Sequence, residues 1–193
     1  MHSGKTVEVD NTDAEGRFLL ADGLSYLARE KGVRWLVDAA TLTGHAAGTG
    51  KAHAGVVSND ENLEQLAVAS GLISGDHVMP MIFAPEILGP GLESLIADMK
   101  NTGDASQGAG SSAAGVFIWK HIEDVEDVRW LHVDLAGPAL SFPPGSSRMT
   151  AFGVGLLTAM VLAEGSADWV GVTPLALLRE MLMGEGSADS ARL

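Results

Sequence analysis

The feature that most constrains the fold is a repeated alternation of helix-like and strand-like segments along the chain. Apolar residues recur at helical spacing from Phe18 to Ala28, and Lys31-Gly32 supplies a basic last turn and a terminating glycine. Helices are predicted at about 18–31, from the Asn59-Asp60 cap to about Leu72, at 113–123 and at 150–163, and buried strands at 33–39, 54–58 and 128–135. This alternation predicts a layered α/β fold whose sheet is at least partly parallel.

The remaining segments predict connections and one boundary. A short strand is expected at 6–9, a proline-punctuated crossing at 76–95, and loops at 103–112 and 138–149, where Gly, Ser and Pro concentrate. We assign residues 1–163 to one domain. Residues 164–193 form a polar spacer followed by a short helix, with Thr173 and Pro174 in its cap and first positions.

Composition excludes several classes of function. The 193 residues carry 12 Lys+Arg against 25 Asp+Glu, a formal charge of −13, which disfavours nucleic acid as a partner. The chain has no cysteine, so thiolate metal sites and a cysteine nucleophile are excluded. No apolar run is long enough to span a bilayer, so we expect no membrane association and a cytoplasmic protein.

The strongest chemical candidate is the heptapeptide 11–17, which precedes the first predicted helix. Asp13 and Glu15 would point the same way if the segment is extended, and such a pair can ligate a hard divalent cation. The alternative is that both acids cap the helix and complement its dipole. Arg17, at the wrong end of the helix for dipole complementarity, suits either an internal ion pair or a bound anion.

At this heptapeptide, NTDAEGR, the sequence resembles the M17 leucyl aminopeptidases, a family of two-metal exopeptidases of the cytosol. Further segments match the family in order and approximate spacing: SGKTVEV at 3–9, ATLTG at 40–44, ADMKN at 97–101, HVDLAG at 132–137 and FGV at 152–154. The resemblance covers residues 3 to about 160 and is closer to the probable aminopeptidase-like branch. It implies a carboxyl-terminal part of the catalytic domain, with three-layer α/β/α architecture around a central mixed sheet.

The resemblance also implies roles for individual residues. Asp13 and Glu15 are implied metal ligands, with Glu15 bridging two divalent ions, zinc or manganese, with magnesium as a further candidate. Arg17 is the implied catalytic residue, holding a bicarbonate ion that acts as general base. The implied backbone donors to this anion are Ala14, Gly16 and Leu42, and the implied pocket for the substrate's N-terminal side chain is formed by Thr41, Leu42, Gly44 and Ala136. Small residues there leave room for an aliphatic, leucine-type side chain.

His132 and Asp134 fall on one face of a predicted strand, a spacing that suits a base and its orienter. Because the family carries this pair without a catalytic role, we favour a structural hydrogen bond. His45 and His53 flank a Gly-rich loop and are interpreted as surface residues in preference to metal ligands.

In the family, three further metal ligands and a catalytic lysine lie upstream of the region that this chain resembles. Two carboxylates alone should hold two cations weakly, because a hard cation takes about six oxygens. We therefore expect a metal-dependent aminopeptidase acting on peptide substrates, with little activity in this chain alone. The alternative is a catalytically silent, truncated remnant that associates through the family's oligomeric surfaces, since family members are homo-hexamers.

Overall fold

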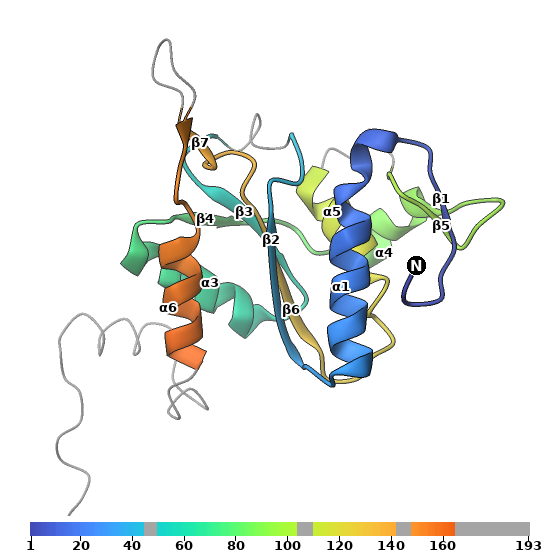
Figure 1. Cartoon of the computed structure of the whole chain (residues 1–193), viewed down its shortest axis with the longest axis horizontal. Helices are drawn as coiled ribbons and strands as arrows, with labels where there is room; N and C mark the ends of the chain where they lie inside the picture. The colour runs from blue at the N-terminus through green and yellow to red at the C-terminus, as the bar shows by residue number, and fades with distance from the viewer. Residues whose placement is uncertain (45–49, 104–109, 142–147, 165–193) are drawn as a thin grey trace, which may run out of the picture.

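The computed structural model describes residues 1–44, 50–103, 110–141 and 148–164, which form a sheet covered by helices on both faces (Figure 1). In chain order the principal elements are β1 Val7–Glu8, α1 Gly16–Glu30, β2 Trp35–Ala40, β3 Ala54–Ser58, α3 Glu61–Ser74, β4 Val78–Pro80, α5 Gly110–Trp119, β6 Arg129–Asp134 and α6 Val154–Glu164. Within these residues no helix combines the length and apolar character that a membrane crossing requires.

The main sheet is mixed, in the order β2-β6-β3-β4. β2 and β6 run parallel in a register that pairs Asp38 with His132, whereas β3 runs antiparallel to β6 and parallel to β4. As a result, β2 and β6 end at the same edge of the sheet, and β3 and β4 end at the opposite edge. The predicted mixed, partly parallel sheet is confirmed.

Helices cover the sheet on both sides, which confirms the three-layer α/β/α architecture. On one face, α1 and α5 bury Leu24 and Phe117 against Trp130 of β6. On the other face, α3 and α6 bury Leu66 and Met160 against the strands. Each face of the sheet therefore carries buried apolar side chains, as the continuous apolar runs predicted.

The α5 layer approaches the sheet closely at Gly115. A Cβ built there would lie 2.9 Å from Val57 Cγ1 and 3.4 Å from the Trp130 ring, so no side chain fits without displacing the sheet. This contact explains why a Gly/Ser-rich sequence forms a buried helix: small residues allow α5 to lie directly on β3.

Two predicted loops contain secondary structure. The loop expected at 103–112 gives way to α5 at Gly110, where Ser111 and Ser112 are buried in the first turn. Within 138–149, β7 Leu140–Ser141 pairs antiparallel with β8 Arg148–Met149.

The crossing at 76–95 holds β4, a short helix α4 Pro85–Leu88 and a 3₁₀ turn η2 Gly89–Leu92. The strand expected at 6–9 is β1, which pairs parallel with β5 Met99–Lys100. The predicted helix after Thr173 lies outside the described residues.

Candidate functional site

The heptapeptide 11–17 folds as two successive helical turns rather than as an extended segment. A 3₁₀ turn, η1 Thr12–Ala14, is capped by the Asn11 side chain, which accepts from the Asp13 N–H at 2.9 Å. Glu15 also has helical backbone angles, φ −80° and ψ −28°, and α1 begins at the next residue. The condition under which Asp13 and Glu15 would point the same way is therefore not met, because helical turns rotate residues two apart to different sides.

Asp13 and Glu15 are both exposed, and neither carboxylate makes a hydrogen bond or ion pair within the described part of the chain. Glu15 occupies the N-cap position of α1, yet its side chain makes no capping hydrogen bond. Asn11 caps only η1 and Glu15 makes no cap bond to α1, so neither acid caps a helix through its side chain, although both lie where a negative charge complements the dipole of α1. Both carboxylates are available to an external ligand.

Arg17 lies in the first turn of α1 and is only 8% exposed. Its Nη1 donates to the Asn101 carbonyl at 2.6 Å, and its guanidinium lies 5.8 Å from the centre of the Phe117 ring. Burial lowers the pKa of the Arg17 guanidinium, and the charge of Asp10 acts in the opposite direction. The buried Arg17 Nε has no hydrogen-bond partner among the described residues.

Asn101, just after β5, connects the heptapeptide to the rest of the domain. Its Oδ1 accepts from the N–H groups of Asp10 and Asn11 at 3.0 and 3.3 Å. Its Nδ2 donates to the Asn11 and Ala14 carbonyls at 2.6 and 3.4 Å. The residue is completely buried. Asn101 thus fixes the turn that carries Asp13, and it was not identified as a site residue from the sequence, although it ends the 97–101 motif.

The loop 41–44 follows β2 and lies beside the heptapeptide. A Cβ on Gly16 would lie 3.4 Å from Leu42 Cδ1, which places the start of α1 against this loop. Ala136 follows β6, and because β2 and β6 are parallel, both segments emerge at the same edge of the sheet, where α/β folds bind ligands. Thr41 and Gly44 are exposed and Ala136 is half-buried.

The backbone amide of Leu42, implied as an anion donor by the resemblance, has a different acceptor here. It donates to Asp134 Oδ1 at 3.1 Å, and the Ala136 N–H donates to the same oxygen at 3.1 Å. Gly16, by contrast, is the first residue of α1, where N–H groups lack helical partners. The Ala14 N–H makes a 3.3 Å bond to the Asn11 carbonyl.

His132 does not pair with Asp134. Its Nδ1 lies 2.5 Å from Asp38 Oδ1, and the other oxygen of Asp38 accepts from Trp130 Nε1 at 2.7 Å. The His132 ring is fully buried and stacks on Trp130, with centroids 6.5 Å apart. The structural interpretation of His132 agrees with this burial, but its partner comes from the neighbouring strand. His53 is half-buried, and His45 lies outside the described residues.

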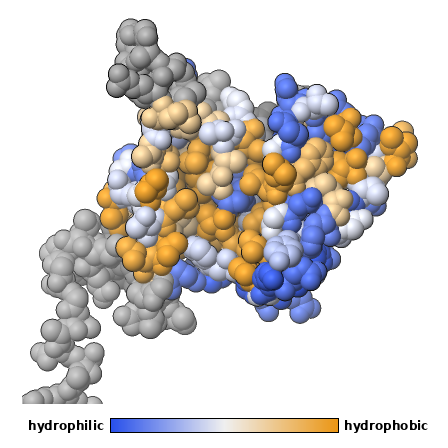
Figure 2. All heavy atoms as spheres, in the orientation of Figure 1, coloured by the Kyte–Doolittle hydropathy of each residue, from blue (hydrophilic) through white to orange (hydrophobic). Residues whose placement is uncertain are grey.

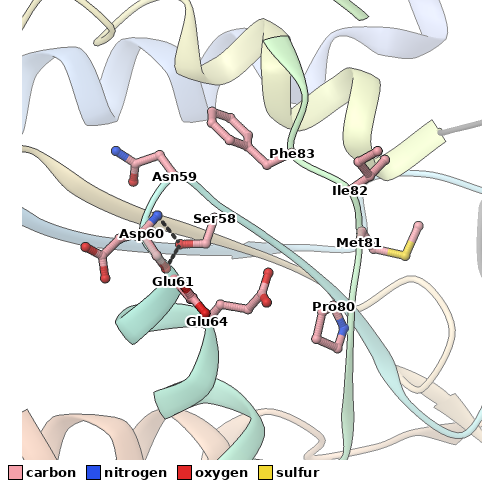
Figure 3. Close-up of a pocket in the computed structure, with 9 residues that line it drawn as sticks. All are labelled: Ser58, Asn59, Asp60, Glu61, Glu64, Pro80, Met81, Ile82 and Phe83. Atoms are coloured by element: carbon pink, nitrogen blue, oxygen red, sulfur yellow. Dashed lines mark hydrogen bonds between the residues drawn. The ribbon is translucent and has the colours of Figure 1, made fainter. Parts of the chain in front are cut away.

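A cavity of about 450 Å³ lies at the opposite edge of the sheet (Figure 3). It is lined by the end of β3, the first turn of α3 and the segment after β4, including Ser58, Glu64 and Phe83. Burial, and the neighbouring charge of Glu61, raise the pKa of Glu64. Because β3 is antiparallel to β6, this cavity is separated from the heptapeptide by the length of the strands.

The residues at the edge of the sheet beside the heptapeptide can contribute to a metal or anion site. Exposed, unpartnered carboxylates are suitable ligands for a hard divalent ion, and an orphaned arginine Nε beside a helix N-terminus suits an anion. In the described ranges no three His, Asp or Glu side chains cluster closely enough to hold a metal by themselves. Asp13 and Glu15 can therefore supply only part of a ligand set.

Comparison with known proteins relates this chain to aminopeptidases of one family. Residues 1–158 match the model of the cytosol aminopeptidase family, catalytic domain. Leucine aminopeptidase 1 of Caenorhabditis elegans is 48% identical over 141 residues, which cover 72% of this chain and 29% of that protein. Probable aminopeptidase NPEPL1 of Homo sapiens is 39% identical over 194 residues, which cover 100% of this chain and 36% of that protein. The chain thus spans about a third of the length of these relatives.

Solved structures agree. The structure of Caenorhabditis elegans leucine aminopeptidase superposes with a TM-score of 0.76 at 42% identity, covering 88% of this chain and 34% of that one. Leucyl aminopeptidase from Leishmania major, in complex with actinonin, superposes with a TM-score of 0.77 at 39% identity, and the match covers 83% of this chain and 30% of that one. The fold, the heptapeptide and these matches together place the chain in the cytosol aminopeptidase family, within its catalytic domain.

Proposed function

We propose that this chain contributes ligands and an anion site to a metal-dependent aminopeptidase that releases N-terminal residues, with a leucine-type preference, from peptides. The observation that carries the proposal is the pair of exposed, unpartnered carboxylates Asp13 and Glu15 beside Arg17, whose buried Nε has no partner among the described residues. Membership of the family and the names of the relatives support the reaction type.

In this proposal Asp13 and Glu15 hold divalent metal, zinc or manganese with magnesium as a further candidate. When bound, such ions polarise a scissile carbonyl and lower the pKa of a coordinated water. Arg17, with the Gly16 amide, would hold a bicarbonate ion as the proton acceptor. The Ala14 and Leu42 amides are not part of this site, because the first donates to the Asn11 carbonyl and the second to Asp134.

Thr41, Leu42, Gly44 and Ala136 would form the pocket for the substrate side chain. What supports this is that the loop after β2 and the turn after β6 lie at one edge of the sheet, with Leu42 in contact with the heptapeptide. An aliphatic N-terminal side chain would pack against Leu42, while the small neighbours leave it room. A cytosolic location and a homo-oligomeric assembly belong to the same proposal.

The first test is calorimetric titration of the 193-residue protein with Mn²⁺ and Zn²⁺, together with hydrolysis of leucine p-nitroanilide. We expect measurable metal binding, little or no turnover, and loss of binding in the double variant Asp13→Ala/Glu15→Ala. The matched control Glu30→Ala/Glu126→Ala removes the same charge from exposed positions and should bind metal as the parent does. Unchanged binding in the Asp13/Glu15 variant would refute the ligand assignment.

A second candidate function is a catalytically silent module that associates with other chains, and the apolar surface favours it. Figure 2 shows apolar side chains gathered over α6, where Val154, Val161 and Leu162 are 65%, 60% and 66% exposed. Beside them, a groove of about 340 Å³ runs along β2, lined by Leu27, Trp35 and Val161 among others. Exposed apolar surface of this kind marks interaction sites.

Sedimentation velocity distinguishes the two candidates when it is combined with the assay. Brisk turnover that requires Asp13 and Glu15 would exclude the silent module. Association that Val161→Ser/Leu162→Ser abolishes, without turnover or metal binding in the parent, would favour it over the enzyme.

A further inference from the structure

Asp134, the last residue of β6, collects four hydrogen bonds on one buried carboxylate. Oδ1 accepts from the Leu42 and Ala136 N–H groups, each at 3.1 Å. Oδ2 accepts from the hydroxyls of Ser111 and Thr43 at 2.6 and 2.7 Å. The residue is 4% exposed. A carboxylate offers about four lone-pair sites, so these four donors use its full capacity as an acceptor. A buried carboxylate with this many donors holds the segments that carry them in fixed positions.

The four donors come from three separate parts of the chain. Leu42 and Thr43 belong to the loop after β2, Ala136 to the turn after β6, and Ser111 to the first turn of α5. The hydroxyl oxygens of Thr43 and Ser111 also lie 3.0 Å apart, so the loop after β2 contacts the first turn of α5 directly. Asp134 therefore fixes the spacing between the two strand-end segments and anchors both beneath α5.

We propose that Asp134 is a positioning residue that sets the width of the side-chain pocket and thereby the preference for aliphatic N-terminal residues. This inference rests on the proposed function, because Leu42 and Ala136 are the pocket residues whose backbones Asp134 holds. Asp134 acts through them and does not contact the substrate. By accepting the Leu42 N–H, it also directs that amide toward the interior rather than toward a bound anion.

The chemistry of the cluster distinguishes substitutions at this position. In Asp134→Asn one oxygen can still accept from both N–H groups, while the new amide group donates to the Ser111 and Thr43 hydroxyls, which can reverse their roles. In Asp134→Ala all four donors lose their acceptor. The first variant should therefore preserve most of the arrangement that the second one loses.

The first arm of the test follows amide hydrogen exchange by NMR. In Asp134→Ala we expect the Leu42 and Ala136 amides to exchange at least about tenfold faster, with core amides such as that of Leu66 unchanged. Asp134→Asn should rescue most of the protection. The control Ser58→Ala removes a buried hydroxyl that donates to the Trp130 carbonyl at the other edge of the sheet, and it should leave both amides as they are. Unchanged Leu42 and Ala136 exchange in Asp134→Ala would overturn the inference.

The second arm measures binding of L-leucinamide and glycinamide in the presence of Mn²⁺. We expect the parent to prefer leucinamide, and Asp134→Ala to lose about tenfold of that preference while Asp134→Asn and Ser58→Ala keep it. An unchanged preference in Asp134→Ala, despite faster exchange, would refute the role in specificity. If neither amide binds the parent, the proposed function fails and the specificity role is rejected with it, whereas the exchange result still decides whether Asp134 organises these loops.

Discussion

Replacement of Asn101 tests whether the candidate metal ligands depend on a scaffold that is distant in sequence. Asn101→Asp retains both acceptor bonds to the Asp10 and Asn11 amides, but it replaces the Nδ2 donor with an oxygen that faces the Asn11 and Ala14 carbonyls. The short 2.6 Å bond to Asn11 is lost, the weaker 3.4 Å bond to Ala14 is lost, and a charge is placed in a fully buried position.

Each lost neutral hydrogen bond contributes about 1 kcal/mol, and leaving the introduced buried oxygen without a donor adds about 1–3 kcal/mol. Counting the long bond as a partial contribution, we expect the free energy of unfolding to fall by about 2–4 kcal/mol at pH 7. The loss should shrink at pH 4.5, because protonation of the introduced carboxyl group restores a donor for the Asn11 carbonyl. Urea unfolding of the parent and the variant at both pH values measures this difference.

The same variant should weaken Mn²⁺ binding, because the turn that carries Asp13 is no longer held. Asn59→Asp is the matched control: Asn59 Nδ2 donates to the Val128 carbonyl at 2.8 Å and its Oδ1 accepts from the Trp130 N–H at 2.7 Å, at the opposite edge of the sheet. It should be destabilised to a similar degree without a change in metal binding. A drop of less than about 0.5 kcal/mol in Asn101→Asp, or equal metal binding by all three proteins, would refute the reasoning.

Two further predictions concern the fold. Gly115→Ala would place a Cβ 2.9 Å from Val57 Cγ1, so we expect the free energy of unfolding in urea to fall by about 1–2 kcal/mol despite the better helix propensity. Gly23→Ala in α1, which has open space around it, should instead raise the free energy of unfolding by up to about 1 kcal/mol. Equal effects of the two substitutions would contradict the packing argument. Desolvation, followed by the positive charge of Lys5, lowers the pKa of His121 to about 4, so the folded state resists a protonation that the unfolded state accepts from about pH 6.5 downward. Stability should therefore fall between pH 6.5 and 4 and less steeply in His121→Gln, and an identical pH dependence of the two urea midpoints would argue against this cause.

The layered fold was predictable because the spacing of apolar residues within each element indicates which of its faces is buried. Helical spacing along α1 and apolar runs in β2 and β6 follow from local sequence alone. The start of α5 was not predictable in this way, since Gly and Ser are common in loops and only the close contact of Gly115 with Val57 explains their presence in a helix.

The candidate site residues could be selected from the sequence, but the contacts that hold them could not. Asp13, Glu15 and Arg17 stand out in one heptapeptide, whereas the partner of His132 depends on strand register. Asp38 lies opposite His132 only because β2 and β6 pair in parallel, and no local pattern specifies that alignment. Asn101 and Asp134 act on groups about 90 residues away, which periodicity does not reveal.

The hydrogen bonds of Asn101 also have a consequence for the order of folding. The bond from its Nδ2 to the Asn11 carbonyl joins residues 90 positions apart, so a long loop must close before the turn at Asp13 is held. Contacts of such separation form slowly, after local helices have appeared. We therefore expect the turn that carries Asp13 to form late, and a short peptide containing only the heptapeptide would lack the geometry that Asn101 imposes on it.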